Sequence, residues 1–250
     1  MKETIYTIPV SEAYEKDCEC PLCELERNLE NEAVEYALGA AMMEPDFRIN
    51  SNDKGYCRRH FTKMFDSGNK LPLALVLDTH LEETEKKIRH FEKSAEKIKS
   101  EKKGVFKKSA AADVADEISK LLETVTSSCV VCDKVNYTME RYINVLLDMY
   151  FDYPEFKEKF DLSKGVCLPH FKMLSDFAKK SLKGEKLNIF LSVLIKKELM
   201  ELSRIREDIH KFTLKFDYRN KDMEWGTAKD APIRTIEKLS GYIENSADNS

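Results

Sequence analysis

The sequence predicts an all-α protein built from two similar helical repeats, and three observations lead to this prediction. The 250 residues contain only 8 glycines and 7 prolines, too few for the many turns of a β-sandwich or barrel. Apolar residues recur at steps of three and four along much of the chain, as they do on the buried face of a helix. A set of cysteine and histidine motifs occurs twice in the same order.

Composition and charge exclude several classes of protein. Hydrophobic residues make up 42% of the chain and charged residues 34%, which is typical of a soluble helical protein rather than a disordered one. The formal charge of −4 provides no basic field, so nucleic acid is not a favoured partner. The N-terminal segment lacks the features of a signal peptide, and the longest apolar runs are too short to span a bilayer. We therefore expect a cytoplasmic protein with no membrane segment.

The duplicated motifs are pairs of potential metal ligands. The first half contains Cys20-Pro-Leu-Cys23 and Gly55-Tyr-Cys57-Arg-Arg-His60, and the second contains Cys129-Val-Val-Cys132 and Gly165-Val-Cys167-Leu-Pro-His170. The CxxC motifs are 109 residues apart and the CxxH motifs 110. Four ligand-type residues repeated in order indicate an internal duplication. We predict a first repeat at 1–108, a second at 109–218, and a C-terminal segment at 219–250 with a short helix and a disordered end.

Each repeat is expected to contain the same elements. A helix with one apolar face follows each CxxC and ends at Pro45 or Pro154, and a polar loop then leads to the glycine before each CxxH. A long amphipathic helix follows. A heptad-like stripe runs along it in both repeats, apolar except for a polar third member that the two share: Leu77, Leu81, Thr84, Ile88, Phe91, Ala95 and Ile98, and Leu191, Ile195, Glu198, Leu202, Ile205, Ile209 and Phe212. Because such stripes are usually core, we expect them to pack the two repeats together.

The four ligands of each repeat suit one metal ion. Zinc prefers four tetrahedral ligands drawn from thiolates and imidazoles, and Cys3His is a common structural set. The sequence therefore predicts two sites that take all their ligands from one repeat, Cys20, Cys23, Cys57 and His60 in the first and Cys129, Cys132, Cys167 and His170 in the second. Residues three apart at a helix start can face one point, and the free N–H groups there stabilise thiolates. With all four positions filled, a structural role is favoured over a hydrolytic one.

Zinc, at two ions per chain, is the cofactor that these ligands favour. Iron–sulfur ligation by the same residues and a thiol–disulfide switch at the CxxC pairs are the two alternatives. Cys18 has no counterpart in the second repeat, where Ser127 stands, and is interpreted as a spare thiol. No phosphate-binding loop, nucleophile motif or HExxH is present, so no catalytic residue is predicted.

Several stretches resemble a bacterial family. The opening Ile5–Glu26, the run Met43–Arg48, both CxxC and CxxH motifs and the Trp225–Gly241 segment are similar to an uncharacterised family of anaerobic Gram-positive bacteria, described as a domain of unknown function. The resemblance covers most of the chain. It implies a bacterial cytoplasmic protein with two metal sites, and it implies no activity.

Three functions remain open from the sequence. The first is a metal-stabilised helical module that binds a partner, which could be a protein, a small molecule or a second copy in a homo-oligomer. The second is a regulator that responds to metal or to thiol oxidation. The third is an enzyme that uses a cleft between the repeats.

Overall fold

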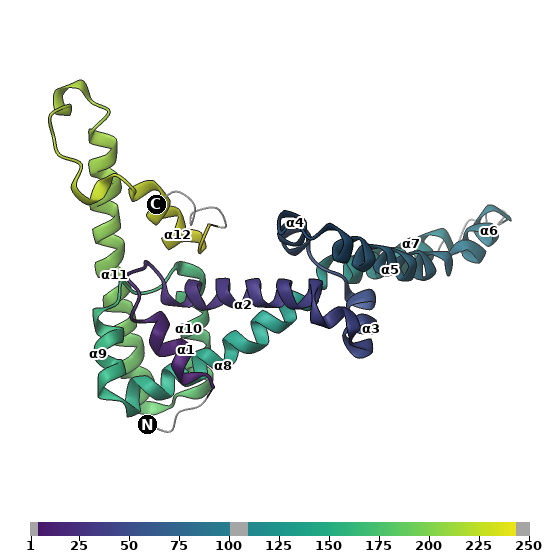
Figure 1. The fold of residues 1–250 in the computed structure, drawn as a ribbon, viewed down its shortest axis with the longest axis horizontal. Coiled ribbons are helices and arrows are strands. Elements are labelled where there is room, and N and C mark those ends of the chain that lie inside the picture. Colours follow the sequence, from purple (N-terminus) through teal and green to yellow (C-terminus); the bar gives the residue numbers. More distant parts are fainter. Residues whose placement is uncertain (1–4, 101–109, 244–250) are drawn as a thin grey trace. The chain divides into compact units, whose positions relative to one another are not determined.

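The computed structural model describes residues 5–100 and 110–243, and every regular element in them is a helix. The predicted all-α class is therefore confirmed. The chain forms two compact units, which we call unit 1 (Met1–Asn28 and Tyr137–Ser250) and unit 2 (Leu29–Asn136). The chain passes from one unit to the other within α2 (Pro21–Leu38) and again within α8 (Val130–Asp152) (Figure 1). Each unit thus contains segments from both halves of the sequence.

Unit 1 is built around a cluster of aromatic side chains. Besides its parts of α2 and α8, it contains α1 (Thr7–Ala13), α9 (Pro154–Leu162), α10 (Leu168–Ser181), α11 (Gly184–Leu214), two short 3-10 turns (Tyr218–Asn220 and Gly226–Ala228) and α12 (Ala231–Ser240). The ring of Tyr150 on α8 meets Phe160 and Phe190 at centroid distances of 5.1 and 5.2 Å. Tyr14 stacks on Phe160 at 5.7 Å and meets Phe156 edge-on at 5.2 Å. These buried edge-to-face and stacked pairs hold together α8, α9 and α11, and one of the CxxH motifs lies in the chain between α9 and α11.

Unit 2 has a smaller core. Besides its parts of α2 and α8, it contains a 3-10 turn (Ala40–Met43), α3 (Pro45–Lys54), α4 (Arg58–Asp66), α5 (Lys70–Arg89), α6 (Glu92–Ser100) and α7 (Ala110–Ser127). Val34 on α2, Met64 on α4 and Leu73 and Val76 on α5 are buried. The position of α4 matters most for function, because it begins directly after Cys57.

Two local predictions were wrong. The segments after Pro45 and Pro154 are helices rather than polar loops, because proline is favoured in the first turn of a helix, and in α9 the side chains of Phe156 and Phe160 pack into the core. The apolar stripe of α5 is also less buried than expected, whereas the stripe of α11 is buried at Glu198 and Ile205. Leu81 is 69% exposed and Ile88 48% exposed on α5, and Ile195 is 47% exposed on α11. The buried face of α5 lies at Leu73 and Val76 instead.

The predicted C-terminal helix is α12. The predicted boundary between the repeats at residue 108 and the predicted disordered end at 245–250 lie outside the described residues. No helix in the described part of the chain combines the length and the apolar character needed to cross a bilayer.

Candidate metal centres

The first group of potential ligands lies in unit 1, at the start of α2 and of α10. It consists of Cys20, Cys23, Cys167 and His170, all of them buried. Nδ1 of His170 lies 3.4 Å from Sγ of Cys20, 3.5 Å from Sγ of Cys23 and 3.1 Å from Sγ of Cys167. The sulfurs of Cys23 and Cys167 are 3.6 Å apart. We call this group the first cluster.

The second group lies in unit 2, at the start of α4 and of α8. It consists of Cys57, His60, Cys129 and Cys132. Nδ1 of His60 is 3.2 Å from Sγ of Cys57, 3.2 Å from Sγ of Cys129 and 3.4 Å from Sγ of Cys132. His60 and Cys129 are buried, whereas Cys57 and Cys132 are half-buried. We call this group the second cluster.

The structure assembles the eight predicted residues in a different pairing from the predicted one. Each cluster joins the CxxC of one repeat to the CxxH of the other, so neither repeat holds four ligands of its own. The prediction that Cys20 and Cys23 share an ion with Cys57 and His60 was therefore wrong. The reason is that α2 and α8 each leave their CxxC and run into the other unit, where the CxxH motif of their own repeat lies.

Both clusters form where two helices begin. Cys20 directly precedes α2 and Cys129 directly precedes α8, while Cys57 and Cys167 are the N-cap residues of α4 and α10. Each cluster thus receives two helix N-termini, whose free N–H groups and dipoles favour negative charge on sulfur. The helix starts predicted at all four motifs are confirmed.

The spacing within the clusters fits a single tetrahedral ion. With metal–sulfur bonds of about 2.3 Å and metal–nitrogen bonds of about 2.0–2.1 Å, the edges of the tetrahedron measure about 3.8 Å between sulfurs and about 3.5 Å between sulfur and nitrogen. The observed distances are 3.6 and 3.8 Å between sulfurs and 3.1 to 3.5 Å between sulfur and nitrogen. All four ligand atoms of each cluster lie within 4.8 Å of one another. All seven cysteines are free, so no disulfide competes for these sulfurs.

Each histidine turns Nδ1 toward the sulfurs and Nε2 toward a glutamate on α2. Nε2 of His60 lies 3.5 Å from Oε1 of Glu30, and Nε2 of His170 lies 3.7 Å from Oε2 of Glu26. The side chain of Glu30 is only 2% exposed and also pairs with Arg59 and Lys63. A carboxylate on the far side of a ligating imidazole fixes its orientation and strengthens it as a donor.

These two glutamates were not predicted from the sequence. Glu26 and Glu30 are two of several acidic residues on α2, and the positions equivalent to them in the second copy are Val135 and Met139. Comparison of the repeats therefore gives no signal for them. Only the placement of α2 beside both histidines identifies them.

Hydrogen bonds inside each cluster favour one ionised sulfur. A hydrogen bond with Cys132 lowers the pKa of Cys129 to about 3, and the pKa of Cys132 rises well above its ordinary value for the same reason. Hydrogen bonds with Cys20 and Cys23 likewise lower the pKa of Cys167, while burial raises the pKa of Cys20. Each cluster therefore holds a thiolate that can attract a cation, and further protons must leave when a metal binds.

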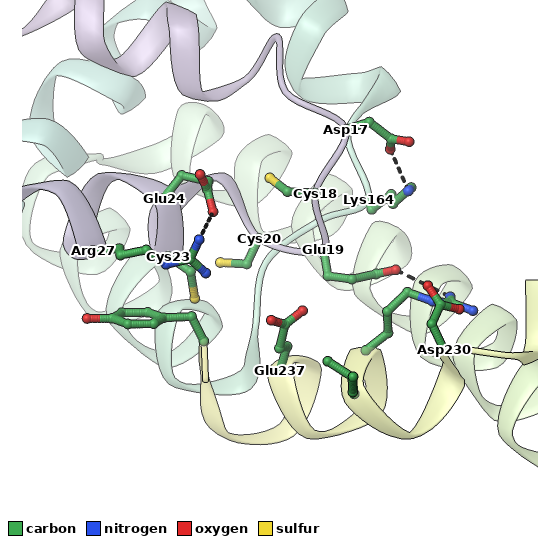
Figure 2. A pocket seen from close by; sticks show the side chains of 13 residues that line it. Asp17, Cys18, Glu19, Cys20, Cys23, Glu24, Arg27, Lys164, Asp230 and Glu237 are labelled. Atoms are coloured by element: carbon green, nitrogen blue, oxygen red, sulfur yellow. Dashed lines mark hydrogen bonds and ion pairs between the residues drawn. The ribbon is translucent and has the colours of Figure 1, made fainter. Parts of the chain in front are cut away.

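A pocket of about 600 Å³ adjoins the first cluster. Figure 2 shows Cys20 and Cys23 at its wall, with Glu237 reaching toward it from α12. Cys18, the predicted spare thiol, also lines this pocket and is half-buried. Ion pairs between residues of the wall join Asp17 to Lys164 and Glu24 to Arg27.

Comparison with known proteins adds a family but no activity. Residues 1–246 match the sequence model of a protein family that is described as a family of unknown function (DUF6062). No curated protein and no solved structure matches the chain.

Proposed function

Since the chain belongs to this family of unknown function (DUF6062), we propose its function from the clusters themselves: it binds two zinc ions, one in each cluster. The observation that carries the proposal is the convergence of three sulfurs and one imidazole nitrogen, all within 4.8 Å of one another, at two places. Three thiolates and an imidazole are a typical ligand set for zinc in proteins.

The spacing supports a single ion over the alternatives that the sequence left open. An iron–sulfur cluster places several atoms between its cysteines and so holds them farther apart than one ion does. A disulfide needs sulfurs about 2.05 Å apart, whereas those of Cys23 and Cys167 are 3.6 Å apart and all seven cysteines are free. Zinc bonded to four protein ligands has no open position for water, so we assign both ions a structural role.

The structural role follows from what each ion joins. In unit 1 the ion would connect Cys23 to Cys167, 144 residues apart in the chain, and in unit 2 it would connect Cys57 to Cys132, 75 residues apart. Closing such long loops restricts the unfolded chain strongly, and the binding free energy of the metal becomes folding free energy.

Elemental analysis of protein purified without added metal tests the proposal. We expect two zinc ions per chain, and removal of zinc by a strong chelator should lower the thermal stability and the helical content measured by circular dichroism. Iron in place of zinc would contradict the choice of metal. A metal-free protein with unchanged stability would contradict the structural role.

A partner-binding role is supported by the surface of α5. Leu71, Leu77, Leu81 and Ile88 on this helix are 71, 41, 69 and 48% exposed. Several large apolar side chains exposed on one helix are typical of a protein interaction surface. We propose that the zinc ions stabilise a scaffold that presents α5 to a protein partner, for which a second copy of the chain is the first candidate to test.

The partner-binding role can be tested by changing α5 alone. Light scattering on the purified protein measures self-association, and Leu77→Lys with Leu81→Lys should reduce it. Leu122→Lys on α7, a leucine that is 39% exposed, is the matched control. A mass equal to one chain for the unchanged protein at every concentration would exclude a second copy as the partner.

A further inference from the structure

The first cluster is more buried than the second, and α12 lines the pocket beside it. Cys20, Cys23 and Cys167 are at most 4% exposed, whereas Cys57 and Cys132 of the second cluster are half-buried. In unit 1, α12 and the residues after it line the pocket beside Cys20 and Cys23 (Figure 2). α12 contacts both segments that carry ligands of the first cluster, the one before Cys20 and the one before Cys167.

The first contact holds the segment before Cys20. Nη1 of Arg234 on α12 lies 3.4 Å from Oε1 of Glu19, the residue directly before Cys20. The side chain of Glu19 is 5% exposed and that of Arg234 14% exposed. Arg204 on α11 pairs with the other carboxylate oxygen of Glu19. Because this ion pair is largely shielded from water, it contributes more to the position of the segment than a surface pair would.

The second contact holds the segment before Cys167. Nζ of Lys238 donates to the carbonyl oxygen of Lys164 at 2.7 Å and lies 3.2 Å from Oε2 of Glu198. Oε1 of Glu198 in turn accepts the backbone N–H of Val166, directly before Cys167, at 2.7 Å. Lys238 and Glu198 are both 1% exposed. A buried ammonium group of this kind is tolerated only while its partners remain in place.

The third contact reaches a ligand itself. Tyr242, just beyond the end of α12, lines the pocket together with Cys23, and a hydrogen bond from its backbone acts to lower the pKa of the Cys23 thiol. The guanidinium carbon of Arg27 lies 4.9 Å from the centre of the Tyr242 ring. Arg234 and Lys238 are four residues apart on one side of α12, so this side contacts both ligand-bearing segments, and Tyr242 follows just beyond Gly241.

We propose that α12 is a strap that closes the first cluster and controls the release of its metal ion. While α12 is docked, it holds the segments before Cys20 and Cys167 and covers Cys20 and Cys23. When it undocks, the pocket opens and solutes reach the sulfurs. A helix of ten residues is unstable by itself in water, so α12 is expected to unfold when it leaves. This proposal rests on the proposed metal binding at the first cluster.

Two variants test the strap, each with a matched control. Lys238→Met removes the charge and keeps an unbranched side chain only one atom shorter, and Lys229→Met, at an exposed position, is its control. Tyr242→Pro removes the N–H that Cys23 accepts, whereas Tyr242→Ala keeps it, so this pair isolates one hydrogen bond. Gly241 precedes this position and has an extended ψ of −179°, which a following proline tolerates.

The measurement is the rate at which zinc passes to an excess of a chromogenic chelator, with mass spectrometry of alkylated cysteines assigning each phase to a cluster. We expect release from the first cluster to be about tenfold faster or more in Lys238→Met, and about tenfold faster in Tyr242→Pro than in Tyr242→Ala. Release from the second cluster and the rates in Lys229→Met should not change.

Unchanged release from the first cluster in both Lys238→Met and Tyr242→Pro would overturn the strap. If Lys238→Met does not fold, the comparison of Tyr242→Pro with Tyr242→Ala tests the strap by itself. If the purified protein holds no metal, the proposed function fails, but the strap is still tested, because it predicts faster alkylation of Cys20 and Cys23 in Tyr242→Pro than in Tyr242→Ala.

Discussion

The glycines before the two CxxH motifs are required by backbone conformation and by close packing. Gly55 and Gly165 have φ of 68° and 74°, a region that residues with a side chain rarely adopt. A Cβ atom on Gly55 would lie 2.4 Å from the ring of His80, and one on Gly165 would lie 2.4 Å from Oε1 of Glu198. The two glycines therefore turn the chain toward each cluster in a space that a larger residue fits only if His80 or Glu198 moves.

Replacement of these glycines by alanine should cost more stability than the backbone conformation alone explains. Gly68 has φ of 78°, and a Cβ atom there would meet no other part of the chain within 4 Å, so Gly68→Ala measures the backbone cost, about 1–2 kcal/mol. We expect Gly55→Ala and Gly165→Ala to lose at least about 1 kcal/mol more, because His80 or Glu198 must move. Denaturant unfolding of the three variants checks this, and equal losses in all three would contradict it.

Glu30 is a single residue on which the geometry of the second cluster depends. It is buried against Nε2 of His60, and Arg59 and Lys63 compensate its charge. Because Nε2 faces this carboxylate, Nδ1 is left to face the three sulfurs.

Glu30→Gln should weaken zinc binding at one of the two clusters. Loss of such a carboxylate typically lowers metal affinity by about 10–100-fold, so one zinc per chain should be lost at a lower chelator concentration while the other is retained. Glu32→Gln, at an exposed position of the same helix, is the control. Competition titration with a chromogenic chelator measures both affinities, and identical curves for the two variants would exclude this role for Glu30.

At the scale of elements, four helix starts build the clusters, and α12 adjoins the first of them. α2 and α10 meet at the first cluster, and α4 and α8 meet at the second. The N-termini supply both the direction of the side chains and a favourable field for thiolates. α12 lines the pocket beside Cys20 and Cys23 of the first cluster, whereas Cys57 and Cys132 of the second cluster are half-buried.

The difference in burial predicts an order of chemical modification. In the zinc-loaded protein, a small alkylating reagent should modify Cys57 and Cys132 before Cys20, Cys23 and Cys167, because reaction requires access to the sulfur. Mass spectrometry of peptides taken over time follows each cysteine separately. Earlier modification of the first cluster, or equal rates at both, would contradict the order.

At the scale of the whole molecule, the crossed pairing makes the two repeats interdependent. Each cluster needs the CxxC of one repeat and the CxxH of the other, so neither repeat can complete a cluster alone. The long helices α2 and α8 carry this exchange, because each begins in one unit and ends in the other.

Double substitutions distinguish the crossed pairing from two independent repeats. Cys20→Ser with Cys167→Ser removes two ligands of one cluster, so we expect one zinc per chain to remain. Cys20→Ser with Cys57→Ser damages both clusters, and we expect no tightly bound zinc. Elemental analysis after dialysis against a weak chelator measures the content, and the reverse result would restore the pairing within each repeat.

The helical class, the duplicated motifs and the identity of all eight cluster residues can be read from the amino-acid chain without coordinates. Helical class follows from periodicity, which is a local property of the chain, and ligand identity follows from residue type and short spacing. The side chains of two cysteines three residues apart lie close together when a helix begins at the first cysteine. The spacing of Cys20 and Cys23 was therefore enough to place them in one site.

Three features depend on the folded structure. They are the pairing of each CxxC with a CxxH, the glutamates that face the histidines, and the leucines that stay exposed. The pairing depends on which unit α2 and α8 enter after their CxxC motifs. Because both repeats offer the same ligands, residue type and spacing do not distinguish the two possible pairings. The packing of segments that are distant in the chain makes this choice, and in unit 1 this packing includes the contacts of Tyr14 with Phe156 and Phe160 on α9.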